Sequence, residues 1–203
     1  MVADIRFVRE LKIRLHKLNL NLPADKETYE LILLSFIKAN EGERLYVYLD
    51  IKKNHTIGIG FNMDSPYAER IWQEIFGYAI SFYRVKEGKQ PITKEQSRLL
   101  FSYVKTSNRL ELITLYQVAW HRLKANEQAM IEDLYWNGGG KLVGKKTNFY
   151  KNIILYITSS ELKYLKTALL EVRENSNPER NRGIQNRRNI QAEMGEPYNN
   201  FDH

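Results

Sequence analysis

The sequence predicts an α+β protein that is mainly α, with a small β-hairpin lobe between an N-terminal helix and a C-terminal helical bundle. Apolar residues recur at three- and four-residue spacing through most of the chain, which is typical of amphipathic helices. Alternation of apolar and polar residues, which is typical of a half-buried strand, is clear only over residues 46–60. We expect a cleft between the lobe and the bundle, because ligand sites often form at such seams.

The composition predicts a folded, basic protein. Hydrophobic residues make up 43% of the 203-residue chain, enough to bury a core, so wholesale disorder is excluded. The absence of Cys excludes disulfides, thiolate catalysis and metal sites built on Cys. The formal net charge of +7 favours an anionic partner such as nucleic acid, a membrane surface or a cell-wall polymer.

Two helices are expected before the hairpin. The first lies within residues 4–22, ends at Pro23, and carries a stripe of Val8, Leu11, Leu15, Leu18 and Leu22. The second should cover residues 26–40, stop at Gly42, and bury Leu31, Leu34 and Ile37. We therefore divide the chain into an amphipathic basic N-terminal extension (1–25), a main domain (26–195) and a C-terminal tail (196–203).

The N-terminal segment also lacks the features of a leader or an anchor. Basic residues interrupt its apolar positions, so the continuous apolar core of about 7–15 residues that a secretory signal needs is missing. No stretch of the sequence approaches the roughly 18 apolar residues of a transmembrane helix. We expect neither Sec export nor a transmembrane segment.

Residues 46–60 predict the hairpin. Tyr46, Tyr48 and Asp50 alternate with two apolar residues, residues 51–55 form a polar loop, and Thr56 starts the return strand. This interpretation places Thr56 across from Asp50.

The rest of the chain predicts helices. They cover residues 65–84, 93–104 (with an alternative end at 117), 126–136, 158–174 and 183–194, and residues 175–181 form a polar loop. Thr93 with Gln96, and Thr158 with Glu161, match the capping box at a helix N-terminus. Asn126 is an expected N-cap, and the glycines at 138–140 should end that helix.

The residues best suited to catalysis surround the hairpin. Glu41 is expected at the C-terminal end of a helix, where the helix dipole disfavours a charged carboxylate, and a protonated carboxyl can serve as a general acid. Asp50, beside a polar loop, should stay ionised, and Thr56 is placed to share a water molecule with it. Two carboxyl groups in unlike environments suit glycoside hydrolysis. A water molecule shared by Asp50 and Thr56 favours inversion at the anomeric carbon. For that mechanism the carboxyl groups of Glu41 and Asp50 should lie roughly 6.5–9.5 Å apart. The alternative is structural: two solvated carboxylates and a strand-forming threonine.

The same residues carry a family resemblance. The spacing of Glu41, Asp50 and Thr56, with the run from Thr56 to Gly60, resembles the signature of the phage-type, T-even phage lysozyme-like endolysin muramidases of glycoside hydrolase family 24. Three later segments resemble the same family in the same order: residues 92–96, 133–148 and 183–188. The resemblance implies a lysozyme-like fold over roughly residues 30–195.

The resemblance also implies the activity: hydrolysis of the β-1,4 bond between N-acetylmuramic acid and N-acetylglucosamine in peptidoglycan. Glu41 is then the general acid, and Asp50 with Thr56 activates the attacking water. Trp136 and Asn137 would line the cleft and contact sugar, although Trp136 also fits a core position. Arg187 or Arg188 would either reach the acid or lie on a solvated last turn.

The chain departs from the family at two positions near the signature. Phe61 stands where many relatives carry His, so an imidazole contact that supports the hairpin is expected to be missing. His55, directly before Thr56, is either a loop residue or a group that makes activity pH-sensitive. Residues 1–25 have no counterpart in compact relatives.

Three functions follow from these residues. The first is a bacteriolytic, antimicrobial phage endolysin, stored in the cytoplasm of the producing bacterial host and acting on the cell wall after release. The second is a muramidase toxin, effector or virion component that uses the N-terminal segment for targeting. The third is a non-catalytic basic module that binds wall polymer or nucleic acid, although no nucleic-acid-reading motif is present. The first interpretation expects a monomer, peptidoglycan as substrate, attraction to an anionic envelope, no nucleic acid, and no metal or cofactor.

Overall fold

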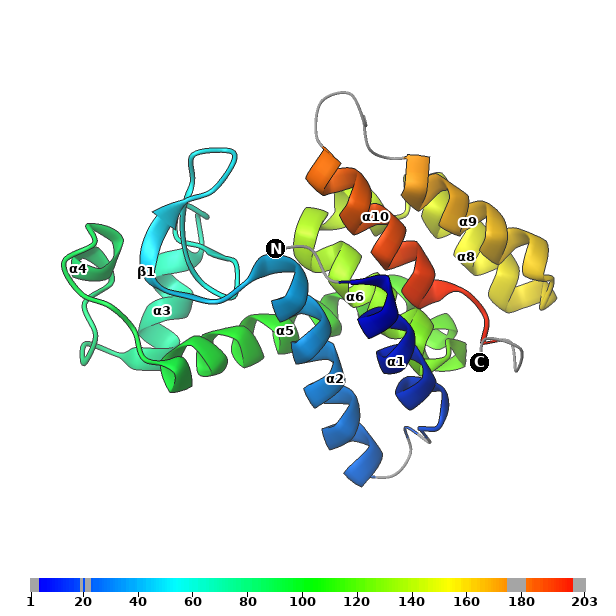
Figure 1. Cartoon of the computed structure of the whole chain (residues 1–203), viewed down its shortest axis with the longest axis horizontal. Helices are drawn as coiled ribbons and strands as arrows, with labels where there is room; N and C mark the ends of the chain where they lie inside the picture. The colour runs from blue at the N-terminus through cyan, green and yellow to red at the C-terminus, as the bar shows by residue number, and fades with distance from the viewer. Residues whose placement is uncertain (1–3, 19, 21–22, 175–181, 199–203) are drawn as a thin grey trace. The chain divides into compact units, whose positions relative to one another are not determined.

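The computed structural model describes residues 4–18, 20, 23–174 and 182–198 (Figure 1). The predicted fold class is confirmed, because helices dominate and one small antiparallel sheet is the β component. The chain divides into two compact units, residues 41–107 and residues 2–40 with 108–203. Leu22, residues 175–181 between two predicted helices and residues 199–203 of the predicted tail lie outside the described residues.

The sheet lies in the first unit. Its three strands run antiparallel in the order β1 (Arg44–Leu49), β2 (His55–Gly58) and β3 (Phe61–Asn62). The predicted hairpin is present as β1 and β2. The third strand was not expected, because two residues are too few to show an alternating pattern.

The register of the hairpin differs from the prediction. Thr56 lies opposite Tyr48, not opposite Asp50, and the pairing is irregular between Arg44 and Tyr48. Asp50 has already left β1 and forms the turn, where its N–H donates to the carbonyl of Asn54 at 2.9 Å. The expected pairing was wrong because the turn begins at Asp50.

A single helix was expected over residues 65–84, and the structure has two, α3 (Ala68–Phe76) and α4 (Phe82–Lys86). Gly77 has a φ of 55°, a conformation that ends α3 and that suits glycine because it lacks a Cβ. Ser81 then caps α4 by accepting a hydrogen bond from the backbone N–H of Arg84 at 3.3 Å. Trp72 is fully buried between the sheet and these helices, with its ring packed edge-on against those of Phe76 and Phe82.

The capping box of the next helix is confirmed. The helix α5 (Lys94–Tyr116) begins after Thr93, whose side chain accepts from the N–H of Gln96 at 3.2 Å. Gln96 in turn accepts from the N–H of Thr93 at 2.8 Å, so two backbone donors at this helix start are satisfied. The 3₁₀ helix η1 (Gln117–Arg122) follows α5.

The second unit begins with α1 (Ile5–His16) and α2 (Pro23–Glu41). Val8, Leu11 and Leu15 are buried along α1, as their spacing predicts. Along α2, however, Ile32, Leu33, Phe36 and Ile37 are buried, whereas Leu31 is 56% exposed. Of the three residues expected on the apolar face, Ile37 is buried as predicted and Leu34 is half-buried, but Leu31 faces solvent. The prediction failed at Leu31 because four consecutive apolar residues at 31–34 do not define the phase of a helix.

The remaining helices of the second unit are α6 (Ala125–Gly138), α7 (Gly140–Val143), α8 (Asn148–Ser159), α9 (Leu162–Glu174) and α10 (Arg182–Gly195). Two predicted N-caps are wrong. Asn126 lies inside α6 and its side chain donates to the carbonyl of Met194 at 2.9 Å. Thr158 lies in the last turn of α8, and its hydroxyl donates back to Ile154 at 2.9 Å. Ser160, with a φ of 60°, separates α8 from α9.

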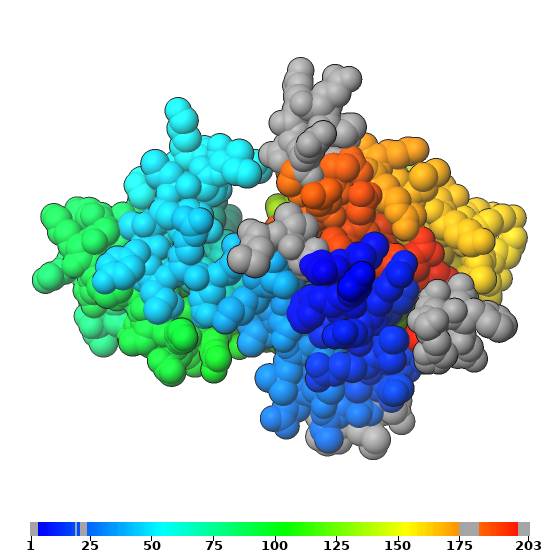
Figure 2. Space-filling view, viewed as in Figure 1, coloured from blue at the N-terminus to red at the C-terminus, as the bar shows by residue number. Residues whose placement is uncertain are grey.

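The first helix packs on the last one. α1 contacts α10 and α6, and Figure 2 shows α1 in dark blue against α10 in orange. Glu193 of α10 accepts from Arg9 at 3.1 Å and from the buried Lys12 at 3.4 Å. Among the described helices, none is long and apolar enough to cross a lipid bilayer.

Candidate active site

All three residues of the predicted catalytic set belong to the first unit. Glu41 is the last residue of α2, as its predicted role requires. Gly42 follows with a φ of 77°, which turns the chain sharply so that β1 starts at Arg44. The carboxyl group of Glu41 therefore lies at the negative end of the α2 dipole.

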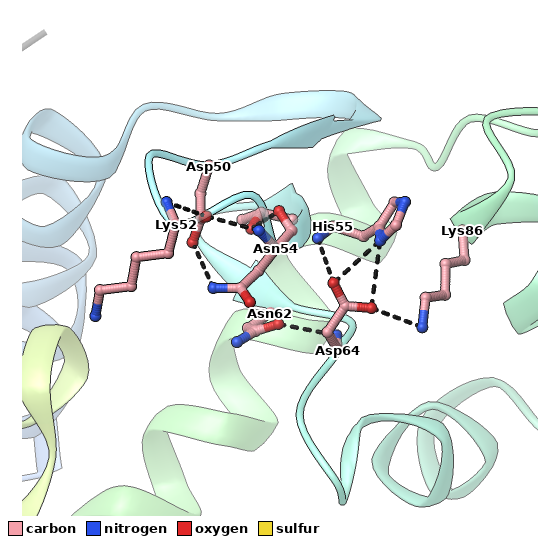
Figure 3. A network of polar contacts seen from close by, with 8 residues as sticks. Asp50, Lys52, Asn54, His55, Asn62, Asp64 and Lys86 are labelled. Atoms are coloured by element: carbon pink, nitrogen blue, oxygen red, sulfur yellow. Dashed lines mark hydrogen bonds and ion pairs between the residues drawn. The ribbon is translucent and has the colours of Figure 1, made fainter.

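Asp50 organises the turn that follows β1 (Figure 3). One carboxylate oxygen accepts from the backbone N–H groups of Lys52 and Asn54, each at 2.8 Å. The other accepts from the side-chain amide of Asn54 at 3.0 Å. Desolvation alone would raise the pKa of Asp50, but the hydrogen bonds from Asn54 and Lys52 outweigh it and leave the pKa below its ordinary value. Asp50 is thus a carboxylate at neutral pH.

Thr56 is buried in β2, with 4% of its surface exposed. Its hydroxyl donates to the backbone carbonyl of Asn54 at 3.2 Å. The same residue, Asn54, therefore binds both Asp50 and Thr56, and links the turn to the strand. With its proton donated to Asn54, the Thr56 oxygen still has lone pairs that can accept a hydrogen bond.

Tyr48 and Arg44 also belong to this part of the sheet, and sequence reasoning missed both. The Arg44 guanidinium lies over the Tyr48 ring, 4.4 Å from its centroid. Burial is the main reason that the pKa of the Tyr48 phenol is raised, and the charges of Glu41 and Asp50 raise it further against the opposing Arg44. The available signal for Tyr48 was the alternation of Tyr46 and Tyr48 with Val47 and Leu49, which predicts a strand but not its register.

A second carboxylate, Asp64, follows β3 and lies beside His55 at the start of β2 (Figure 3). It accepts from the backbone N–H of His55 at 2.6 Å, and the Nδ1 atom of the same histidine lies 3.0 Å away. Lys86 forms an ion pair with Asp64 at 2.7 Å. This ion pair, with the His55 contacts, holds the pKa of Asp64 far below its usual range. Sequence reasoning missed this cluster because its members are distant along the chain.

At the position where many relatives carry His, this chain has a buried phenylalanine, and an imidazole contact to the sheet comes from another residue. Phe61 is buried in β3, and its ring centroid lies 6.3 Å from that of Trp72. The contact between the Nδ1 atom of His55 and Asp64, at 3.0 Å, supplies an imidazole contact to the sheet from a neighbouring position. His55 is therefore bound to the sheet, in contrast to the loop alternative.

The predicted sugar-contacting residues lie in the other unit, on α6. Trp136 is half-buried, and Asn137 is exposed and accepts from Arg188 at 2.9 Å. Arg187 and Arg188 are both buried, so the alternative of a solvated last turn is wrong. Arg187 pairs with the fully buried Asp133 at 3.1 Å.

Within the described part of the chain, no group of three or more His, Cys, Asp or Glu side chains is arranged to hold a metal ion. The first unit offers the carboxyl groups of Glu41 and Asp50 and the hydroxyl group of Thr56. Glu41 and Asp50 differ in environment, one at a helix end and one in a ring of amide donors.

Comparisons with known proteins support one family. No protein-family profile matches the chain. A curated protein of Dictyostelium discoideum, described as probable T4-type lysozyme 2, is 28% identical over 119 residues. The alignment covers 56% of this chain and 69% of that protein. The resemblance of this chain to the phage-type lysozymes, first indicated by the spacing of Glu41, Asp50 and Thr56, is confirmed by this relative.

Proposed function

We propose that the protein is a peptidoglycan hydrolase, a muramidase that cleaves the β-1,4 bond between N-acetylmuramic acid and N-acetylglucosamine. The observation that carries the proposal is the unlike setting of two carboxyl groups in one compact unit. Asp50 accepts three amide hydrogen bonds and is ionised, whereas Glu41 ends a helix at the negative end of its dipole. Two carboxyl groups in unlike settings suit glycoside hydrolysis, in which one donates a proton and the other accepts one.

The proposed reaction proceeds in one displacement. Glu41 donates its proton to the glycosidic oxygen as the bond from that oxygen to the anomeric carbon breaks. A water molecule attacks the anomeric carbon from the opposite face, and Asp50 accepts its proton. The Thr56 oxygen, whose own proton is donated to Asn54, accepts a hydrogen bond from the same water. The product sugar has the inverted configuration.

The remaining roles extend this proposal. Trp136 and Asn137 contact the sugar, and the formal charge of +7 attracts the protein to an anionic envelope. We propose a monomeric endolysin, kept in the cytoplasm of the producing host and active on the wall after release. The burial of Val8, Leu11 and Leu15 against the second unit favours a structural role for α1 over a targeting role.

Clearing of purified Gram-negative peptidoglycan, followed by turbidity, tests the proposal. Glu41→Gln should lower the rate by about 10²- to 10⁴-fold, the usual contribution of a general acid. Glu87→Gln is the matched control, because Glu87 is an exposed carboxylate of the same unit that pairs with Lys89. A Glu41→Gln protein that is folded and clears peptidoglycan at the rate of the control would rule the assignment out.

A further inference from the structure

Asn137, one of the two residues proposed to contact the sugar, is held by a chain of side-chain hydrogen bonds between α6 and α10. Both helices belong to the second unit and pack against each other. The chain of bonds begins at Asp133, which is fully buried in α6, and ends at Asn137, which is exposed in the last turn of the same helix. Gln191 and Arg188 of α10 connect the two ends, and both are buried.

The bonds between these side chains are short. One carboxylate oxygen of Asp133 accepts from the amide nitrogen of Gln191 at 2.6 Å, and the other accepts from Arg187 at 3.1 Å. The side-chain oxygen of Gln191 accepts from the Arg188 guanidinium at 2.6 Å. A second nitrogen of that guanidinium donates to the side-chain oxygen of Asn137 at 2.9 Å.

The chemistry of the two charged groups fixes the direction of every bond. The carboxylate of Asp133, paired with Arg187, can only accept, so Gln191 must turn its amide nitrogen toward it. The oxygen of Gln191 then faces Arg188. A guanidinium has five donors and no acceptor, so the oxygen of Asn137 must face Arg188 as well.

This direction determines which atoms Asn137 offers to a ligand. Because its oxygen faces Arg188, the amide nitrogen with its two N–H groups lies on the opposite edge of an exposed side chain. Two N–H donors suit an oxygen that has lone pairs and no proton, such as the oxygen of an acyl carbonyl. Both sugars of the proposed substrate carry an N-acetyl carbonyl, and the lactyl group of muramic acid carries another.

We propose that Asn137 binds an acyl carbonyl oxygen of the substrate through its side-chain N–H groups, and that Arg188 is the positioning residue that orients this amide. The inference rests on the proposed function, because it assigns the group of the glycan strand that Asn137 contacts. It gives Asn137 a role in recognising acylated sugars, separate from the proton transfers of Glu41 and Asp50.

Asn137→Asp tests the direction of the bond to the ligand. The aspartate keeps an oxygen for Arg188 but replaces the two N–H donors by a second acceptor, to which a carbonyl cannot donate. In the Glu41→Gln background, which prevents hydrolysis, the Kd for soluble peptidoglycan fragments should rise by about 10-fold, the effect of losing one hydrogen bond.

Asn189→Asp is the matched control. Asn189 is an exposed asparagine of α10 whose side-chain oxygen accepts from Gln185 at 3.2 Å, and the substitution changes the charge by the same amount. This variant should bind the fragments with the affinity of its parent.

Two ligands distinguish the sources of the carbonyl. An oligomer of N-acetylglucosamine carries only N-acetyl carbonyls, whereas the peptidoglycan fragments also carry the lactyl carbonyl. Weaker binding of both ligands to Asn137→Asp assigns the N-acetyl group, and weaker binding of the fragments alone assigns the lactyl group. Unchanged affinity for both ligands overturns the inference, because a hydroxyl partner, unlike a carbonyl, could reverse its role and donate to the aspartate.

Arg188→Lys tests the positioning role. A lysine ammonium lacks the planar fork that binds Gln191 and Asn137 together, so KM should rise in the protein that retains Glu41, with kcat unchanged. Because Arg188 acts through Asn137, the double variant Asn137→Asp/Arg188→Lys should bind no more weakly than Asn137→Asp alone. Additive losses would overturn the role of Arg188. Failure of the proposed function is distinct, because it requires that Glu41→Gln remain active.

Discussion

Two aspartates on either side of the start of β2, one in the turn after β1 and one just after β3, are both held ionised, yet by different partners. The donors that the structure shows on Asp50 are uncharged amides from Asn54 and Lys52, so the negative charge of the carboxylate is kept. Asp64 is instead paired with the ammonium of Lys86 and contacted by His55, so its charge is largely compensated. The difference separates a carboxylate that can take part in a reaction from one that holds a sheet together.

The pKa values of Asp50 and Asp64 are both low, but for different reasons, so the two residues need not have the same role. Amide donors lower the pKa of Asp50 by favouring its charged form. The pKa of Asp64 is lowered first by Lys86, which is itself bound in the process. A low pKa alone does not identify a catalytic group, and the partners of the carboxylate must be considered with it.

Among changes to the two aspartates and their partners, the largest expected effect comes from Asp50→Asn. The neutral amide cannot accept the proton of the attacking water, so peptidoglycan clearing should fall by about 10²-fold or more. The melting temperature should change little relative to that loss, because an amide oxygen still accepts from the two backbone N–H groups. If Asp64→Asn reduced clearing as much as Asp50→Asn, the distinction between the two carboxylates would be wrong.

A smaller effect is expected from Asn54→Ala, which removes one of the three donors to Asp50. The pKa of Asp50 should rise toward its ordinary value, because one hydrogen bond to the charged form is lost. The acid limb of the pH–rate profile should then move to higher pH, with little change in the rate at its plateau. Rates measured between about pH 3 and pH 6 cover the ordinary titration of an aspartate and check this shift.

The smallest effect on activity is expected from Asp64→Asn, which should instead lower the melting temperature. The folded-state pKa of Asp64 is depressed, so its contribution to stability is present above the unfolded-state value, about 3.9. The contribution is lost as the pH falls below that value toward the depressed folded-state pKa. The wild type and the variant should therefore differ in melting temperature at pH 7 and converge in strong acid. A difference that persists unchanged at low pH would show that the charge of Asp64 is not its cause.

Local signals allowed much of the fold to be predicted from the sequence. The hairpin strands alternate, the capping box at Thr93 satisfies local donors, and α1 carries a regular stripe of Val8, Leu11 and Leu15. The failed predictions are those in which one local pattern fits two structures. Thr158 and Glu161 match a capping box, yet the Thr158 hydroxyl binds within α8 because that helix continues to Ser159.

Some residues of the candidate site could be predicted from the sequence, whereas others depend on long-range contacts. Glu41 at a helix end and Asp50 beside a turn followed from chain neighbours, so their settings were predictable. The contact between His55 and Asp64 depends on how β2 and β3 pair, and the contact with Lys86 depends on where α4 packs. Such long-range contacts leave no periodic trace in one sequence, and Tyr48 was missed because its register with Thr56 depends on an irregular strand.

The packing of α1 on α10 has a consequence for the order in which the protein can fold. Residues 41–107 are continuous, so the first unit is complete on a ribosome long before synthesis ends. The second unit contains residues that precede the first unit and residues that follow it. Lys12 can therefore bind Glu193 only after α10 has been synthesised. Until α10 has been synthesised, the apolar face of α1 lacks its main packing partner. Val8, Leu11 and Leu15 are then exposed in the nascent chain, where apolar residues can make non-native contacts. α10 thus completes the packing of a helix, α1, that is synthesised well before it.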